Sequence, residues 1–128
     1  MKPCILYFSR TGNTKRMAEA IAAALKASVF DVTFSDPSVV EDFDVLILGT
    51  PVEGFRPAKP AADFVKRLPK ADGKRAILFC TYKLWKGGVF KILERDLSSK
   101  GYRVILSVPK RGIKFDKPAD FLDCVQKV

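Results

Sequence analysis

The stretch Tyr7-Phe8-Ser9-Arg10-Thr11-Gly12-Asn13-Thr14-Lys15 leads a predicted strand directly into a predicted helix through a short polar turn. The strand is expected within residues 2–8, and the helix follows because Met17, Ile21 and Leu25 recur at helical spacing. The start of a helix has unpaired backbone N–H groups and a partial positive charge, which together attract an anion. The turn adds side-chain donors and one glycine that lets the backbone approach closely, at Ser9, Thr11, Gly12, Asn13 and Thr14. This combination predicts a phosphate site, and a turn that only caps the helix is the alternative.

Four further strand-like runs alternate with helical patterns along the 128 residues. The strands are expected at 28–34, 44–49, 75–80 and 102–108, and the helices around 61–68, 90–97 and 121–125. The segment 35–43 is short and polar, so a full helix is not expected there. The runs 45–48 and 76–79 are continuously apolar, which is typical of strands covered by helices on both faces. The pattern predicts one domain, residues 1–128, with a three-layer α/β fold built on a doubly wound, five-stranded parallel sheet.

Composition excludes several classes of function. The chain has no histidine, which removes the usual general base and the commonest transition-metal ligand, so hydrolytic triads are excluded. Cys4, Cys80 and Cys124 are widely spaced, and two of them lie in apolar runs, so we expect reduced thiols and no metal site. No apolar run approaches the ~20 residues of a membrane span, and the N-terminus lacks the pattern of a signal peptide. We therefore expect a cytoplasmic protein without a membrane anchor.

The ligand site of a doubly wound sheet lies beyond the carboxyl ends of the strands, where the strand order reverses. We therefore expect the loops after the first, third and fourth predicted strands to converge, at residues 9–14, 50–60 and 81–88. The second and third loops carry Phe55, Tyr82 and Trp85 in polar surroundings, which indicates a planar ligand between aromatic walls. The alternative is that these aromatic side chains fold back onto the core.

The motif Ser9-Arg10-Thr11-Gly12-Asn13-Thr14, with the strand before it and the helix after it, resembles the phosphate loop of the flavodoxin family. The resemblance covers essentially the whole chain in the family's short form, and it implies the strand order 2-1-3-4-5. It also implies FMN as the cofactor, bound without a metal, with the motif residues around its phosphate. The flavin ring would lie between two later loops, whose implied binding residues are Thr50, Pro51, Val52, Glu53, Gly54, Phe55, Thr81, Tyr82, Lys83, Trp85, Gly87 and Gly88.

The resemblance implies an electron carrier whose redox chemistry belongs to the flavin. In flavodoxins a peptide of the first ring loop flips on reduction, so that a carbonyl accepts a hydrogen bond from the protonated N5 of the ring. Gly54 would ease such a flip because it has no Cβ, although a glycine that only shapes the loop is the alternative. Tyr82 is the first choice for the aromatic that stacks on the ring, and Trp85 is the second.

The charge of this chain departs from that of the family, whose members are typically acidic. Lys and Arg number 23 against 14 Asp and Glu, a net charge of +9. The basic residues in or beside the predicted site loops are Arg10, Lys15, Arg56, Lys59, Lys83 and Lys86. Nearby positive charge favours the anionic reduced flavin, so we expect a less negative second reduction potential than in an acidic flavodoxin. We also expect a monomer or weak dimer whose partner is an acidic redox protein, such as a ferredoxin or a rubredoxin.

Several other functions fit less well. Nucleic-acid binding is disfavoured because the basic residues are scattered and no recognised motif is present. Cys4 and Arg10 match the spacing of a cysteine phosphatase, but that thiol must lie at the loop itself. A receiver domain would need acidic residues where Ser9 and Gly49 stand. An FMN-dependent NAD(P)H or quinone reductase, and a flavin-free interaction module on the same fold, remain the alternatives.

Overall fold

The computed structural model describes residues 2–54, 56–82 and 87–111. The predictions for Phe55, Lys83, Trp85, Cys124 and the helix around 121–125 lie outside the described residues, as does the side chain of Tyr82. In chain order the elements are β1 (Pro3–Tyr7), α1 (Asn13–Leu25), β2 (Ser28–Asp31), the 3₁₀ helices η1 (Val32–Phe34) and η2 (Pro37–Asp42), β3 (Val45–Glu53), β4 (Arg56–Pro57), α2 (Lys59–Lys66), β5 (Lys74–Tyr82), α3 (Val89–Ser99) and β6 (Tyr102–Arg111).

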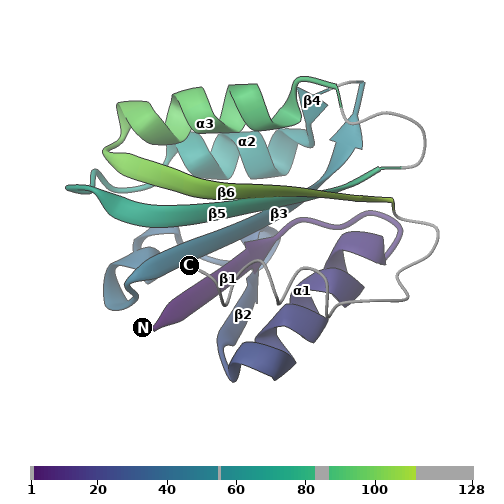
Figure 1. Ribbon diagram of the computed structural model, residues 1–128, viewed down its shortest axis with the longest axis horizontal. Helices are drawn as coiled ribbons and strands as arrows, with labels where there is room; N and C mark the ends of the chain where they lie inside the picture. Colours follow the sequence, from purple (N-terminus) through teal and green to yellow (C-terminus); the bar gives the residue numbers. More distant parts are fainter. Residues whose placement is uncertain (1, 55, 83–86, 112–128) are drawn as a thin grey trace.

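The five long strands form a parallel sheet in the order β2-β1-β3-β5-β6 (Figure 1). Counting only these strands, this is the predicted order 2-1-3-4-5, so the predicted fold class is confirmed. The order reverses after β1, because β2 and β3 lie on opposite sides of it. The carboxyl ends of β1, β3 and β5 consequently lie beside one another at one edge of the sheet.

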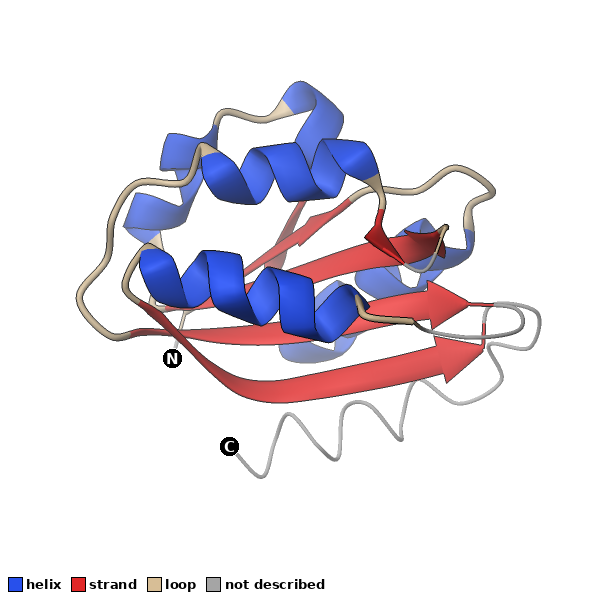
Figure 2. Ribbon diagram, turned by 90° about the horizontal axis from the view of Figure 1, so that it is seen from above, coloured by secondary structure: helices blue, strands red, loops and turns tan. Residues whose placement is uncertain are grey.

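The sheet separates two apolar clusters of side chains, and Figures 1 and 2 show the helices that cover them. α1 covers one face, and α2 and α3 lie side by side on the other. The alternation of side chains along a strand explains how one apolar run serves both layers. In β3, Leu46 and Leu48 join the cluster beneath α2 and α3, whereas Ile47 joins the cluster beneath α1. No helix within the described residues is long and apolar enough to cross a membrane.

The second strand is shorter than predicted. β2 ends at Asp31, and residues 32–34, which were expected to continue it, form the 3₁₀ helix η1. The cause is local: the Asp31 carboxylate accepts a hydrogen bond from the backbone N–H of Thr33 at 2.8 Å, and Ser35 Oγ donates to the Asp31 carbonyl at 2.7 Å. These bonds turn the chain away from the extended conformation. The absence of a full helix in 35–43 is confirmed, because that segment holds only the 3₁₀ helix η2.

The third strand is longer than predicted. β3 continues through residues 50–53, which were assigned to a ring-binding loop, and β4 then pairs with its end in antiparallel fashion. The pairs are Val52 with Pro57 and Glu53 with Arg56, so the chain reverses tightly through Gly54. The first ring loop is therefore a short hairpin that projects beyond the sheet. β5 likewise continues through Tyr82.

Candidate functional site

The turn after β1 and the start of α1 have the geometry of an anion site. Gly12 is the N-cap residue, with φ 96°, a left-handed conformation that favours glycine. Its own N–H donates to Ser9 Oγ at 3.0 Å, which closes the turn. Among the described residues, no side chain makes a capping hydrogen bond at the start of α1, and the first turn of the helix carries no acidic residue. The alternative of a turn that only caps the helix therefore lacks its defining hydrogen bond, and the first N–H groups of α1 remain available to a ligand.

A buried pair of hydroxyls joins this turn to the end of β5. Thr14 Oγ1 and Thr81 Oγ1 lie 2.7 Å apart, and the two residues are 1% and 4% exposed. Each hydroxyl has one hydrogen, so when one donates to the other, the second hydrogen is left to donate outside the pair. A buried donor at the first turn of a helix suits an anionic acceptor such as a phosphate oxygen. The pair also brings together two loops that the sequence predicted to converge.

An ion pair joins the same turn to the end of β3. Arg10 Nε contacts Glu53 Oε2, and Arg10 Nη2 donates to Glu53 Oε1 at 3.2 Å. The hydrogen bond with Glu53 and its charge raise the pKa of Arg10. The guanidinium also lies over the ring of Phe8, 5.0 Å from its centre. The positive charge of Arg10, which the sequence suggested would act on the ligand, is thus partly neutralised by Glu53.

The other predicted residues either make hydrogen bonds within the protein or lie at least partly exposed at this edge of the sheet. Thr50 is fully buried; its hydroxyl accepts from the backbone N–H of Ala58 at 3.0 Å and donates to the Pro51 carbonyl at 2.9 Å, so it braces the hairpin. Asn13 Oδ1 accepts a hydrogen bond from Arg16, so the side-chain N–H groups of Asn13 are not used in this contact. Among the rest, Thr11 and Gly54 are exposed, and Pro51, Val52, Gly87 and Gly88 are half-exposed.

Gly54 forms the tip of the hairpin. It has φ 58°, and a Cβ at this position would meet no atom within 4 Å. Glycine is therefore favoured by the backbone conformation and not by crowding, which agrees with a peptide that can change orientation at low cost. Gly87 also has a positive φ, 59°, and Gly88 is the N-cap residue of α3.

Sequence reasoning missed both side-chain partnerships that organise the site. Arg10 and Glu53 are 43 positions apart, and Thr14 and Thr81 are 67 apart. Only the opposite charges of the first pair offered a signal, and nothing in the sequence distinguished Glu53 from the other acidic residues as the partner of Arg10.

Comparisons with known proteins agree with this geometry. A sequence model of the flavodoxin domain matches residues 4–90. The flavodoxin of Megasphaera elsdenii is 39% identical over 92 residues, which cover 66% of this chain and 66% of that protein. The flavodoxin of Clostridium beijerinckii is 32% identical over 109 residues, 79% of each chain. The solution structure of two-electron reduced Megasphaera elsdenii flavodoxin superposes with a TM-score of 0.80 at 27% identity, over 91% of this chain and 90% of that one. A chain with this strand order, this turn before α1 and these relatives belongs to the flavodoxin family.

Proposed function

We propose that this protein binds one FMN at the carboxyl edge of its sheet and carries electrons between redox partners. The observation that supports the proposal most strongly is the uncapped N-terminus of α1, with a buried hydroxyl pair behind it. A phosphate there meets backbone N–H groups, roughly half a positive charge from the helix, and side-chain donors. The family's flavodoxins add the expectation of a flavin.

The residues of the turn have distinct tasks in this proposal. Ser9 holds the turn closed through Gly12, while Thr11, which is exposed, offers a hydroxyl from the rim. Thr14 and Thr81 supply the buried donor and fix the start of α1 against β5. Because the donors are held by protein contacts before any ligand arrives, little ordering is required when the phosphate binds.

The hairpin at the end of β3 is the proposed ring-binding segment. When bound, FMN supplies one-electron and two-electron redox chemistry. Gly54 lies between the paired residues Glu53 and Arg56 at the hairpin tip, and because it has no Cβ a change of peptide orientation costs little there. The ion pair with Arg10 anchors Glu53 from its side chain, so the backbone of the tip can move while its base stays in place.

A comparison of FMN binding with riboflavin binding tests the phosphate site and the ring site separately. Riboflavin lacks the phosphate, so loss of a phosphate donor should weaken FMN and leave riboflavin unchanged. Thr11→Val should weaken FMN by roughly tenfold or more, because hydrogen bonds to charged groups contribute about 1.5–3 kcal/mol. Thr33→Val, at an exposed threonine of η1, is the matched control and should change neither affinity. Quenching of flavin fluorescence measures the affinities for FMN and for riboflavin.

The outcome that contradicts the proposal is a protein that stays colourless and ignores FMN at micromolar concentration. Electron transfer is tested separately, by stepwise reduction of the flavin-loaded protein under anaerobic conditions with its visible spectrum recorded. Rapid oxidation of NAD(P)H in the presence of a quinone would show that the protein acts as a reductase and not as an electron carrier.

A further inference from the structure

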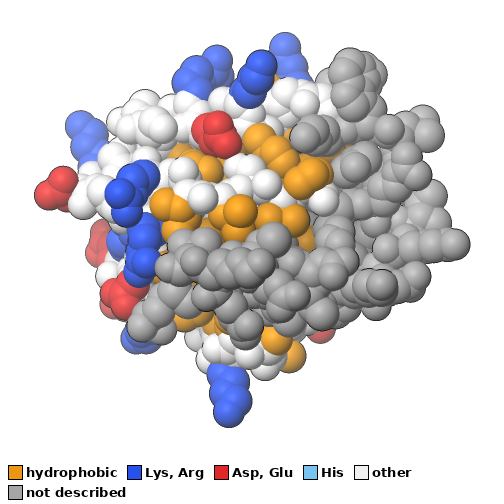
Figure 3. Space-filling model, in the orientation of Figure 1, with side chains coloured by type: hydrophobic (Ala, Val, Ile, Leu, Met, Phe, Trp, Pro, Cys, Tyr) orange, Lys and Arg blue, Asp and Glu red, His pale blue; other side chains and the backbone are white. Residues whose placement is uncertain are grey.

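The groove between α2 and α3 gathers positive charge close to the proposed ring-binding hairpin. A hollow of about 510 Å³ lies there, and its rim carries four basic side chains, Arg56, Lys59, Lys66 and Arg95. All four are exposed. In Figure 3, Lys and Arg side chains project from the upper edge of the molecule, where Figure 1 places α2 and α3. The cations come from three elements that pack together, β4, α2 and α3, so the fold and not one run of sequence assembles them.

The two acidic residues of this groove, Asp63 and Asp96, present less surface than the cations do. Both are only half-exposed as residues. Asp96 is drawn inward: its Oδ1 lies 3.5 Å from Arg95 Nε, and its Oδ2 is buried without a hydrogen-bond partner among the described residues. The groove therefore presents four exposed basic side chains against two half-exposed acidic ones, and Asp96 offsets the charge of Arg95 alone.

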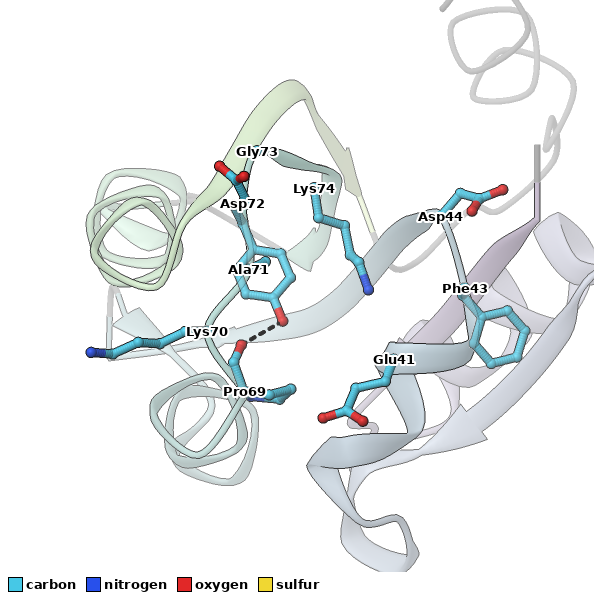
Figure 4. Close-up of a pocket in the computed structure, with 10 residues that line it drawn as sticks. Glu41, Phe43, Asp44, Pro69, Lys70, Ala71, Asp72, Gly73 and Lys74 are labelled. Atoms are coloured by element: carbon cyan, nitrogen blue, oxygen red, sulfur yellow. Dashed lines mark hydrogen bonds between the residues drawn. The ribbon is translucent and has the colours of Figure 1, made fainter.

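A second hollow, at the opposite edge of the sheet, shows that this charge is not spread evenly. It is lined by Glu41, Asp44 and Asp72 as well as by Lys70 and Lys74 (Figure 4). The ammonium group of Lys74 is already engaged, because it donates to the Val40 carbonyl at 2.8 Å. The edge away from the proposed flavin site thus has more acidic than basic residues, whereas basic residues outnumber acidic ones in the groove between α2 and α3.

The groove also has an apolar floor and a fixed position relative to the proposed flavin. Pro57, Ala62 and Ile92 line it between the charged side chains. An apolar centre with a charged rim is typical of protein–protein interfaces. Arg56, at one end of the groove, pairs in the sheet with Glu53 of the hairpin, so a protein seated here lies next to the ring-binding segment.

We propose that this groove is the docking surface for an acidic redox protein, and this inference rests on the proposed electron-carrier function. Discrete carboxylates of a folded partner can sit opposite single cations, with its apolar side chains on the floor. A nucleic-acid backbone fits less well, because its continuous negative charge would also face Asp63. A second copy of this chain is disfavoured by the net charge of +9 on each.

The test is a titration of the isotope-labelled protein with an acidic ferredoxin, followed by amide NMR shifts at low and at high ionic strength. We expect shifts along α2, α3 and β4 that diminish with salt. Lys59→Ala/Lys66→Ala removes two positive charges from the rim. The matched control, Ala23→Glu/Ala24→Glu, changes the net charge by the same amount at exposed positions of α1, on the other face of the sheet.

The rim variant should weaken ferredoxin binding by roughly fivefold or more, and the α1 variant by no more than about twofold, because close charges steer and hold a partner more than distant ones. Equal weakening by both variants, or shifts confined to other surfaces, overturns the proposal. A groove that responds to pyrophosphate or to duplex DNA but not to ferredoxin also overturns it.

The titration is run on FMN-loaded and on FMN-free protein, so that the two proposals fail separately. Groove shifts with ferredoxin in a protein that never binds FMN support the docking surface and contradict the carrier function. FMN binding without shifts in the groove supports the flavin site and contradicts the docking surface.

Discussion

The hydroxyl pair of Thr14 and Thr81 allows a sharp test of how the site is held together. Replacement of either residue by valine keeps the shape of the side chain but leaves the other hydroxyl without its partner, in a place where both residues are almost completely buried. A buried polar group that loses its partner costs about 1–3 kcal/mol, whereas removal of both partners can be nearly neutral. Each single variant should therefore lose ~2 kcal/mol, and Thr14→Val/Thr81→Val should lose less than the two losses combined.

Urea unfolding of the FMN-free protein measures these differences. With a slope of about 2 kcal/mol per molar urea, each single variant should move the midpoint down by ~1 M. The expected coupling between the two sites is ~1–3 kcal/mol, well above the roughly 0.5 kcal/mol seen for independent sites. Thr33→Val, at an exposed site, should change stability by less than about 0.5 kcal/mol. If the two single losses simply add in the double variant, the hydroxyls do not act as a unit and the reasoning fails.

Three further predictions concern stability and potential. Gly101→Ala should lower the free energy of unfolding in urea by more than ~2 kcal/mol, because Gly101 has φ 92° and a Cβ would overlap the Ala71 carbonyl. The control Gly73→Ala, at φ 78° in open space, should lower it by only ~1 kcal/mol, and equal losses would contradict this. Burial raises the pKa of Cys4 from 9.0 to about 12, with a smaller opposing effect of the Lys74 charge. The Cys4 thiol ionises at a lower pH in the unfolded chain than in the folded protein. Its contribution to the free energy of unfolding is therefore fully present below pH 9 and should fall above it by up to ~1.4 kcal/mol per pH unit. Cys4→Ala should remove this component, and an unchanged pH slope would refute it. The second reduction potential of bound FMN should be less negative than in an acidic flavodoxin. Glu53→Gln should raise this potential by a further roughly 20 to 90 mV, because it removes one negative charge about 8 Å from the ring. Potentiometry that shows no rise would count against Arg10 and Glu53 acting at the ring.

Within the described residues, the five strands of the parallel sheet and the helices α1, α2 and α3 could be predicted because their signals are local. The apolar runs 45–48 and 76–79 lie in the sheet, and the helical spacing of Met17 and Ile21 places both on the face of α1 that packs against it. The errors lie at the ends of elements. Residues 50–53 contain Pro51 and polar side chains, which favour a loop locally, but pairing with β5 and β4 keeps them extended. Strand ends depend on pairing with other strands, such as β5, that lie far away in the sequence, so periodicity alone cannot locate them.

The candidate site divides in the same way. Residue spacing and backbone preference are properties of adjacent residues, so they were enough to predict a polar turn with a glycine between a buried strand and a helix. Three features are visible in the folded chain alone: Thr14 contacts Thr81, Glu53 forms an ion pair with Arg10, and basic residues of β4, α2 and α3 share one groove. The physical reason is that a parallel sheet aligns the ends of strands that are far apart along the chain, and hydrogen bonds and charges act only across the short distances that this alignment creates.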